Sequence, residues 1–341
     1  MTLQPTSPPP GHRQAAAGMT LIELLVAMAL GLLITLAAAA ALLVARQGFT
    51  AVDAGSQLQD NGRFLRSIIQ RLVVQAGYKD LQFAVDTAQA PGASALLPPD
   101  IFGLNNRSRA PGDAWNQGTE RTVGQIDYGS DILVLRYQSN SMDVDPTVSD
   151  KTMIDCAGVA ATTAPTKVDD ELLSIFHVRI GRNGEPTLMC SRLGANSTTY
   201  DTYPLLSGVE NFQLLYGVDG VAPGNTAVPP ASTPDSVPER YLRADQLTVA
   251  NNDKATYANW HRVRSIRVGV VLRGPPGSAI DRSSQTFYPF GISKSSAGGT
   301  KGSAFADSTN DPGTAYTPAA DGRLRQTVTF TVHLRNPQGE W

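Results

Sequence analysis

A single carboxylate stands at the edge of the most apolar stretch of this chain. Glu23 directly precedes 22 residues that carry no charge, Leu24–Ala45. An ionisable group at membrane depth costs roughly 2.5–3.5 kcal/mol unless something compensates for it, so it is a functional candidate by default. The chemistry that its position predicts is the capture of a positive charge at the end of an apolar helix.

Catalytic groupings are the second kind of chemistry to consider. The four histidines, His12, His177, His261 and His333, do not show metal-ligand spacing. The sequence contains neither a G-x-S-x-G nucleophile motif nor a cysteine cluster that would bind a metal. We therefore expect no catalysis, no cofactor and no metal site, and keep a membrane-anchored periplasmic enzyme as an alternative.

Two further charged groups have simple explanations. The first group is acidic and consists of Asp143, Asp145 and Asp150. It lacks the glycine and the final glutamate of an EF-hand loop, so a polar acidic loop is the better interpretation. The second group is basic and fits solvated strand edges as well as it fits a binding patch; its residues are Arg262, Arg264 and Arg267.

The element that positions Glu23 must be a membrane-spanning helix. Twenty-two residues at about 1.5 Å each give about 33 Å, enough to cross the hydrocarbon core of a bilayer. A cleaved secretory signal would be shorter and would end in a small-residue cleavage site. A plain signal anchor explains the length of the segment but not its acid.

A third interpretation accounts for both the length and the acid. The stretch Gly18–Met28, GMTLIELLVAM, resembles the class III signal of type IV pilins and type II secretion pseudopilins. The resemblance implies a leader of residues 1–18, cleavage by prepilin peptidase between Gly18 and Met19, and N-methylation of Met19. Glu23 then becomes the fifth mature residue. The family usually has Phe where Met19 stands.

Cleavage at this bond would create a matched pair of charges. The new α-amine of Met19 lies one helical turn from Glu23. In a bundle of such subunits, Glu23 of one chain would neutralise the Met19 amine of its neighbour and set the axial register, as buried polar groups do in coiled coils. Arg13 precedes the span and fits the positive-inside rule, which places the rest of the chain in the periplasm.

The helix is expected to continue from the membrane into a globular head, over residues 20–76. We expect a membrane and assembly half, 19–45, an amphipathic half, 46–77, and a periplasmic head, 78–341. Gly77 is a plausible C-cap. The apolar stripe that defines the second half is Leu58, Leu65, Ile68, Ile69, Leu72, Val73 and Ala76. Three glycines seven residues apart, Gly48, Gly55 and Gly62, indicate either weak helix propensity or a close-packing face.

The head has the pattern of antiparallel strands. Short apolar or period-2 runs occupy 131–138, 172–180, 210–216, 264–273 and 325–335, which predicts half-buried strands. Segments 88–125, 220–240 and 274–322 are rich in Pro, Gly and Ser and are expected to be long loops. The predicted fold class is α+β: a long N-terminal helix packed on a mainly antiparallel β-sheet head.

The two cysteines, Cys156 and Cys190, have two interpretations. A periplasmic location permits a disulfide between them. It would close a loop of about 35 residues and contribute roughly 3–4 kcal/mol by the chain-entropy model. Two buried free thiols are the alternative, and the spacing excludes a C-x-x-C redox pair.

The overall charge gives no support for nucleic-acid binding. The 341 residues include 28 Lys and Arg against 30 Asp and Glu, a formal net charge of −2. A nucleic-acid-binding domain would show a basic face or stripe, and none is evident.

The head carries a narrower resemblance. Five stretches, in this order, resemble PilW-type minor pilins: 76–78 (AGY), 130–135 (SDILVL), 207–219 (SGVENFQLLYGVD), 260–268 (WHRVRSIRV) and 334–336 (LRN). The resemblance implies an inner-membrane subunit, single-pass with a periplasmic head, that enters the pilus. It would prime fibre growth in a tip complex and support twitching motility and adhesion.

The same resemblance implies a set of partners. These are prepilin peptidase, other minor pilins, the major pilin and a tip-associated adhesin, with 220–260 and 274–322 as candidate partner-binding surfaces. A J-type pseudopilin of a type II secretion system is the close alternative.

Overall fold

The computed structural model describes residues 18–80, 97–167, 170–193, 199–223, 235–292 and 312–336. Most of the expected leader, including His12 and Arg13, lies outside these residues. The chain divides into two compact units, Met1–Thr50 and Ala51–Trp341. Helix α1, Leu21–Gln75, begins in the first unit and ends in the second.

In the first unit, α1 is exposed along its length. Every described residue up to Thr50 is exposed, including the uncharged run Leu24–Ala45. The helix is long and apolar enough to cross a membrane. Its backbone groups bond within the helix, so only its apolar side chains require a surrounding of lipid or other helices.

In the second unit, α1 buries one stripe and ends at a glycine. The buried residues are Ala54, Leu58, Gly62, Leu65, Ile69, Leu72, Val73 and Gln75. Gly77 has a φ of +74°, the left-handed conformation that favours glycine after a helix. Its N–H donates to the carbonyl of Arg136 at 2.9 Å, which ties the end of the helix to the sheet. The expected helix, 20–76, therefore agrees with the observed one to within one residue at each end.

The three evenly spaced glycines of α1 are not equivalent. A Cβ on Gly62 would lie 2.9 Å from Cγ2 of Val328, so this glycine allows a close approach. At Gly55 the nearest atom, in Leu324, is 4.0 Å away, and at Gly48 nothing lies within 4 Å. The close-packing interpretation holds at Gly62, and Gly48 and Gly55 have no such reason to be glycine.

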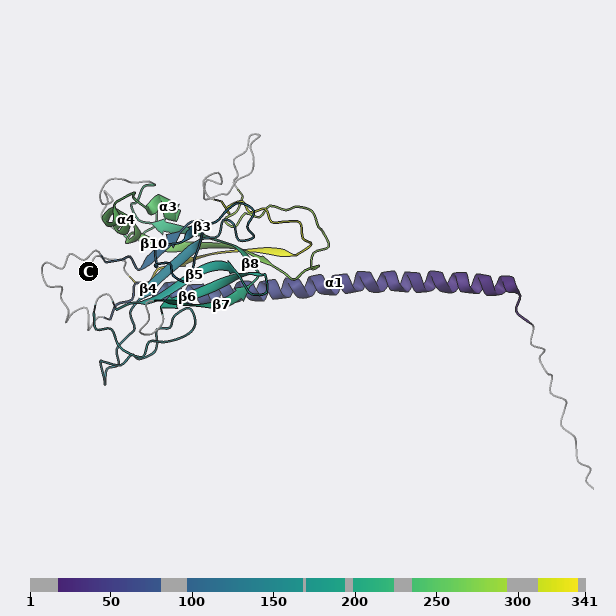
Figure 1. The fold of residues 1–341 in the computed structure, drawn as a ribbon, viewed down its shortest axis with the longest axis horizontal. Coiled ribbons are helices and arrows are strands. Elements are labelled where there is room, and N and C mark those ends of the chain that lie inside the picture. The colour runs from purple at the N-terminus through teal and green to yellow at the C-terminus, as the bar shows by residue number, and fades with distance from the viewer. Residues whose placement is uncertain are drawn as a thin grey trace, which may run out of the picture. The chain divides into compact units, whose positions relative to one another are not determined.

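The head contains a five-stranded antiparallel sheet (Figure 1). Its strand order is β1-β4-β5-β6-β7. The bounds are Ile101–Leu104 for β1, Ile132–Tyr137 for β4, Leu172–Ile180 for β5, Pro186–Leu193 for β6 and Tyr200–Ser207 for β7.

A second, four-stranded antiparallel sheet has the order β11-β10-β8-β9. The bounds are Val209–Val218 for β8, Arg240–Leu242 for β9, Val263–Arg273 for β10 and Arg325–His333 for β11. Strands β2, Arg107–Ser108, and β3, Thr119–Glu120, form a small separate pair. Helices α3, Ala244–Leu247, and α4, Asp253–Trp260, lie between β9 and β10 in sequence.

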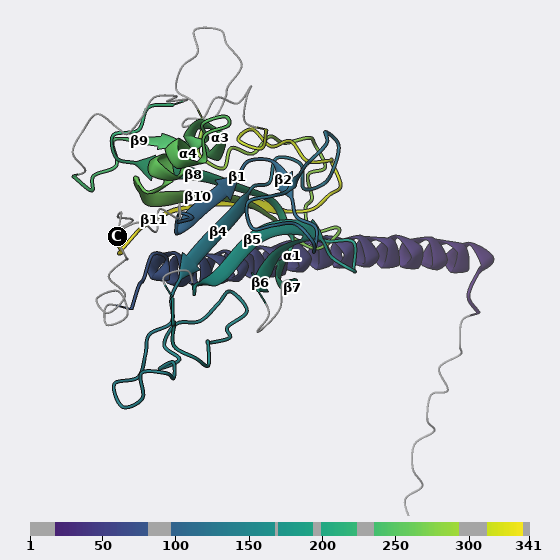
Figure 2. The same cartoon turned by 60° about the vertical axis from the view of Figure 1, so that its left-hand side comes forward.

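One core joins these elements. Buried residues of α1 from Leu58 to Val73, with Ala76 just after the helix, form a single cluster with residues of both sheets, α3 and α4. Figure 2 shows the strands β4, β5 and β6 passing alongside the part of α1 that belongs to the head. The predicted α+β class, with a long helix packed on mainly antiparallel strands, is confirmed.

The prediction that the strands are half-buried is wrong for two of them. Every residue of β4 and of β8 is buried. Loops cover the second face of β8: Gln213 donates from Nε2 to the carbonyls of Gly129 and Pro312. Because these loops come from segments without periodicity, the sequence pattern of β8 does not reveal them.

The loop predictions are correct only in part. The segment 88–125 contains β1, β2 and β3, and 220–260 contains β9, α3 and α4. Strands β6 and β7 were not predicted. In the described parts of 274–322, Phe287 and Tyr316 exchange two backbone hydrogen bonds of 2.8 and 2.9 Å, so these parts of the loop pair with each other.

A disulfide joins Cys156 to Cys190. Cys190 lies on β6, and Cys156 lies in the segment between β4 and β5. The same segment is held to α1 by Gln75, which donates from Nε2 to the carbonyl of Ile154 at 2.9 Å. The cross-link therefore fastens a long connection to the five-stranded sheet.

Candidate functional site

Glu23 is the N3 residue of a capping box at the start of α1. Its Oε2 accepts from the backbone N–H of Thr20 at 3.0 Å and from the Thr20 hydroxyl at 3.1 Å. In return, the Thr20 hydroxyl oxygen accepts from the Glu23 N–H at 3.3 Å. This reciprocal arrangement satisfies donors that would otherwise be left open at the helix end. We did not predict this role, although the spacing Thr-x-x-Glu before an apolar run is its known sequence signal.

The capping box fixes the position and the orientation of the Glu23 carboxylate. Its carboxylate sits at the N-terminal end of α1, where the helix dipole favours negative charge. Gly18 and Met19 lie just outside the helix and are exposed. The bond between them is thus accessible in the chain, and a positive charge on Met19 would adjoin a carboxylate that the helix end already orients.

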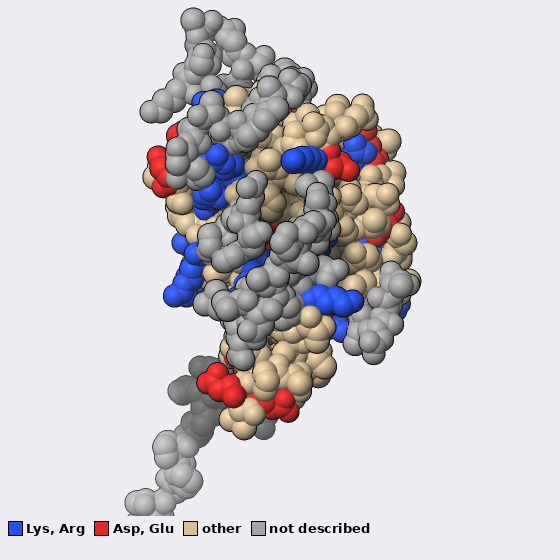
Figure 3. Space-filling model, turned by 90° about the vertical axis from the view of Figure 1, so that its left-hand side faces the viewer, with Lys and Arg blue, Asp and Glu red and all other residues tan. Residues whose placement is uncertain are grey.

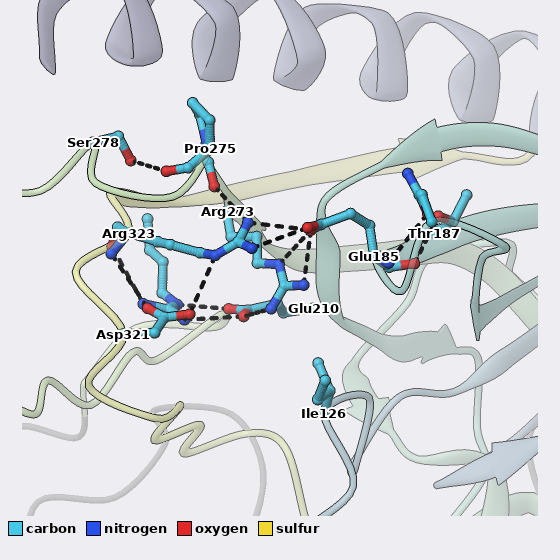
Figure 4. Close-up of polar contacts among 12 residues, drawn as sticks. Ile126, Glu185, Thr187, Glu210, Arg273, Pro275, Ser278, Asp321 and Arg323 are labelled. Atoms are coloured by element: carbon cyan, nitrogen blue, oxygen red, sulfur yellow. Dashed lines mark hydrogen bonds and ion pairs between the residues drawn. The ribbon is translucent and has the colours of Figure 1, made fainter. Parts of the chain in front are cut away.

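The head contains a network of six charged residues whose centre is buried (Figure 4). Glu210 on β8 is at its centre and is 1% exposed. It accepts from Arg273 Nη1 at 3.0 Å and from Arg325 Nε at 2.6 Å. Arg273 also donates to Glu185 Oε2 at 2.9 Å, and Arg325 donates to Asp321 Oδ1 at 2.8 Å.

The sixth member of the network is Arg323. It donates to Glu185 at 2.9 Å and lies 3.4 Å from Asp321. Burial alone would raise the pKa of Glu185, but hydrogen bonds from Arg323 and Arg273 hold this pKa below its ordinary value. Three acids thus face three arginines, and every carboxylate is an ion-pair partner. Such a network ties β8, β10, β11 and the β5–β6 turn together and leaves no free acid here for catalysis.

A second buried charge cluster lies where α1 leaves the core. Lys79 contacts Glu171 and lies 3.1 Å from Asp100, and Arg136 donates to Glu171 at 3.2 Å. Burial raises the pKa of Asp100 to about 6, against the opposing charge of Lys79. The cluster joins the end of α1 to strands β4 and β5, so its role is also structural.

The histidines belong to separate elements of the head. His177 on β5 is buried, and its Nε2 lies 2.9 Å from the hydroxyl of Ser191. Burial, with the nearby charges of three arginines, lowers the pKa of His177 to about 3. His261 is the C-cap residue of α4, and His333 ends β11. A buried neutral histidine bonded to a buried serine is a core contact, not an accessible base.

Several acidic side chains of the head pair with arginines or accept hydrogen bonds within turns. In the acidic loop, Asp145 caps the backbone N–H of Thr147 at 3.0 Å, and Asp150 accepts from Asn140 at 2.8 Å. Among the described residues, a group with metal-compatible spacing consists of Asp219, Asp235 and Glu239.

The carboxylate of Asp219 already faces two arginines. Arg262 Nη1 lies 3.6 Å and Arg264 Nε 3.5 Å from it. The solvated-edge interpretation of Arg262 and Arg264 is therefore wrong: their side chains balance a buried acid. A cation at this acid would have to compete with two guanidinium groups.

The charged surface does not form a continuous basic face on the side that Figure 3 shows. Among the residues coloured there, Lys and Arg side chains lie in separate groups, with Asp and Glu at several edges. This distribution is unlike the basic stripe of a nucleic-acid-binding protein.

Two family models match the chain. Residues 175–336 match "Type IV Pilus-assembly protein W", and residues 13–39 match "Prokaryotic N-terminal methylation motif". The first match spans β5 through β11, and the second spans Gly18, Met19 and Glu23. None of the curated proteins matches the chain.

A solved structure also resembles the chain. It is a type IV-like pilin from Thermus thermophilus, with 13% sequence identity and a TM-score of 0.37. The similarity covers 83% of this chain and 98% of that one.

Proposed function

We propose that this chain, which belongs to the PilW-type type IV pilins, is a minor pilin that takes part in pilus assembly. Prepilin peptidase would cut between Gly18 and Met19, and Met19 would be N-methylated. The apolar part of α1 would then hold the protein in the inner membrane as a single span, with its head in the periplasm.

The observation that carries this proposal is the combination of signal and head in one chain. The methylation-motif match surrounds the Gly18–Met19 bond, and the protein W match covers most of β5 and the strands from β6 to β11. A J-type pseudopilin would share the first feature. The match of the head to the protein W model favours a subunit of the pilus over a subunit of a type II secretion system.

In the assembly, α1 would exchange lipid for other pilin helices. The part of α1 that belongs to the first unit exposes apolar side chains on every side, which suits contact with lipid and contact with other helices. We infer that Glu23 accepts the Met19 amine of a neighbouring subunit there, because a charge pair removes the cost of a lone ion at membrane depth. The partners would be other minor pilins, the major pilin and a tip-associated adhesin, in a complex that primes fibre growth and supports twitching and adhesion.

The capping box dictates how the role of Glu23 is tested. Glu23→Leu removes both the charge and the cap, so a defect would be ambiguous. Glu23→Gln removes the charge and keeps a residue that suits the N3 position of a capping box. Thr20→Ala is the matched control, because it removes the cap and keeps the carboxylate.

The measurement is co-purification of other pilins with the tagged full-length protein from membranes. We expect Glu23→Gln to lose most of these subunits while remaining inserted, and Thr20→Ala to retain them. Normal co-purification with Glu23→Gln would rule out the charge pairing. A loss confined to Thr20→Ala would show that the cap, not the charge, matters for assembly.

A further inference from the structure

A buried lysine lies between two carboxyl groups at the point where α1 meets the sheet. Of the lysines that the structure describes, Lys79 is the only one that is not exposed. Its Nζ lies 3.1 Å from Oδ1 of Asp100 and contacts Oε1 of Glu171. The three side chains are 10%, 6% and 6% exposed, in that order. An amine and two carboxyl groups, largely shielded from water, are the nucleophile, the electrophile and the proton carrier that amide formation requires.

The backbone on both sides of the site is fastened to the same strand. The carbonyl of Tyr78 accepts from the N–H of Gln138 at 2.9 Å, and the carbonyl of Asp100 accepts from the N–H of Arg136 at 2.8 Å. Arg136 lies on β4 and Gln138 follows it directly. Lys79 and Asp100 are therefore held close together before any reaction. Groups held in this way react as if their concentration were about 10⁵–10⁸ M, which favours a condensation that separate amino acids in water do not undergo.

The two carboxyl groups have different surroundings. Oε2 of Glu171 accepts from Nη1 of Arg136 at 3.2 Å, so Glu171 has a second cationic partner besides Lys79. The guanidinium of Arg136 in turn lies over the ring of Trp115, 4.2 Å from its centroid. Because an arginine does not give up its proton, Glu171 keeps a balancing charge when the lysine becomes neutral.

The proton of Lys79 can be transferred within the site. Burial lowers the pKa of Lys79, but the charges of Asp100 and Glu171 outweigh this effect and raise its pKa above the ordinary value. Burial also raises the pKa of Asp100, to about 6. Asp100 therefore takes up a proton more readily than an ordinary aspartate, which makes it the acid suited to attack by an amine.

We propose that Lys79 and Asp100 join in an intramolecular isopeptide bond, a covalent modification that the chain makes by itself. The ammonium proton of Lys79 passes to Asp100, which leaves a neutral amine beside a neutral carboxylic acid. Nζ then attacks Cγ of Asp100, and a C–N bond forms. Glu171 takes a proton from this nitrogen and delivers it to the departing hydroxyl, so the C–O bond breaks and one water leaves. Glu171 ends as the carboxylate that it was at the start.

The bond joins the end of α1 to the start of β1. Lys79 follows the helix after its glycine cap, and Asp100 directly precedes β1. The disulfide between Cys156 and Cys190 fastens a different connection to the same sheet, and an amide, unlike a disulfide, is not opened by reduction. The inference does not depend on the proposed function, because its three residues lie in the head and no other subunit takes part.

Peptide mass spectrometry of the unmutated full-length protein tests the bond. Trypsin cuts after free lysine and arginine, so a chain without the bond gives the separate peptides 72–79 and 80–107. With Lys79 in an amide this cut is blocked, and we expect one peptide, 72–107, that is lighter by one water, about 18 Da. Its fragment spectrum should contain no fragments from breaks between positions 79 and 100, because a single break there does not separate a closed ring.

Three variants assign the roles. Asp100→Ala removes the carbon that is attacked and should abolish the linked peptide. Glu171→Gln keeps the shape of the side chain but removes the proton carrier, so formation should slow by about 100-fold or more in protein sampled soon after synthesis. Glu185→Gln is the matched control: it makes the same change in the other charge network of the head and should leave the linked peptide unchanged.

The decisive result comes from the unmutated protein, so it does not depend on how well the variants fold. Recovery of 72–79 and 80–107 in place of the linked peptide would overturn the proposal. A peptide that joins Lys79 to 168–179, which contains Glu171, would overturn it too, because the other acid would then be the one attacked. An unchanged rate in Glu171→Gln would reject the proton transfer through Glu171. None of these results alters the test of the proposed function through Glu23→Gln.

Discussion

At the scale of single residues, the local role of Glu23 is compatible with the intermolecular role that we propose for it. In the capping box, Oε2 of the carboxylate accepts hydrogen bonds from the backbone N–H and the hydroxyl of Thr20 at the start of α1. A carboxylate has two oxygens and about four lone-pair sites. Acceptance of a neighbouring amine is therefore compatible with the cap, and the helix end pre-orients the acid for it.

Gly62 illustrates a residue whose identity is set by packing. Gly62→Ala should destabilise the protein by about 1 kcal/mol, because the overpacking cost of about 1–3 kcal/mol exceeds the gain in helix propensity of up to about 1 kcal/mol. The new Cβ would clash with Val328, whose β-branched side chain has few alternative rotamers. Thermal unfolding of the detergent-solubilised chain measures the change.

The matched control for Gly62 is Gly55→Ala. A Cβ at position 55 would have its nearest neighbouring atom at 4.0 Å, so this substitution should raise the stability of the protein by up to about 1 kcal/mol. Equal effects of the two substitutions would contradict the close approach at Gly62.

His177 makes the head sensitive to acid. Its pKa is about 3 in the folded protein, below the ordinary value of 6.5, because burial disfavours the charged ring. The unfolded chain therefore binds more protons between these values, and stability is lost as the pH falls below about 6.5. From pH 7 to pH 5 the loss is about 2 kcal/mol.

His177→Gln should remove this part of the pH dependence, since Gln does not titrate. Asp100 acts in the opposite direction, because its pKa is raised to about 6, but its contribution is the same in both proteins and cancels in the comparison. Urea unfolding at pH 7 and pH 5 is the measurement. Parallel losses in the two proteins would mean that His177 is not the titrating group.

At the scale of elements, the ion pairs of Glu210 join β8 to β10 and β11 within the four-stranded sheet, and Glu185 links this sheet to the β5–β6 turn. Glu210→Gln would leave Arg273 and Arg325 buried with less compensation, since their side chains are 7% and 6% exposed. Breaking a buried ion pair in this way costs roughly 3–5 kcal/mol. We expect a correspondingly large fall in the denaturation midpoint.

Glu185→Gln provides the comparison within the same network. The side chain of Glu185 is 25% exposed, so water can replace part of what it supplies, and the loss should be clearly smaller. A Glu210→Gln variant no less stable than Glu185→Gln would show that the buried ion pairs of Glu210 do not hold β8, β10 and β11 together.

The elements that could be predicted are those whose pattern is local. Strand β10 shows alternating Ile266, Val268 and Val270, and the stripe of α1 repeats every three or four residues. Strand β7 is an edge strand with exposed residues and a proline at Pro204, so neither periodicity nor propensity marks it. Strand β1 is four residues long and contains Gly103, within a segment rich in loop residues.

The charge network could not be predicted, because it is assembled from distant parts of the chain. Glu185, Glu210 and Arg325 are separated by up to 140 positions in sequence. Only the pairing of β10 with both β8 and β11 brings Glu210 close to both Arg273 and Arg325. The N-terminal site is different: its residues lie within one short stretch, so roles for Gly18, Met19 and Glu23 could be predicted from the sequence and stay predictions. The cap made by Thr20 was not predicted.

At the scale of the whole molecule, the two units differ in the surface that they expose. The described residues of the first unit are exposed and largely apolar, and the second contains the core. Such a division is expected of a subunit that is stored in a bilayer and then transferred to a fibre, where other helices replace lipid. In the proposed function, the transfer depends on a new amino terminus at Met19 that pairs with Glu23.

Intact-mass spectrometry of the protein purified from membranes tests this account most directly, with a host that lacks prepilin peptidase as the control. We predict a mature chain that begins at Met19 and carries one N-methyl group, and an uncleaved chain in the control host. A mature protein that retains residues 1–18, or that is cut at another bond, would contradict the account, because Glu23 would then have no adjoining amine to pair with.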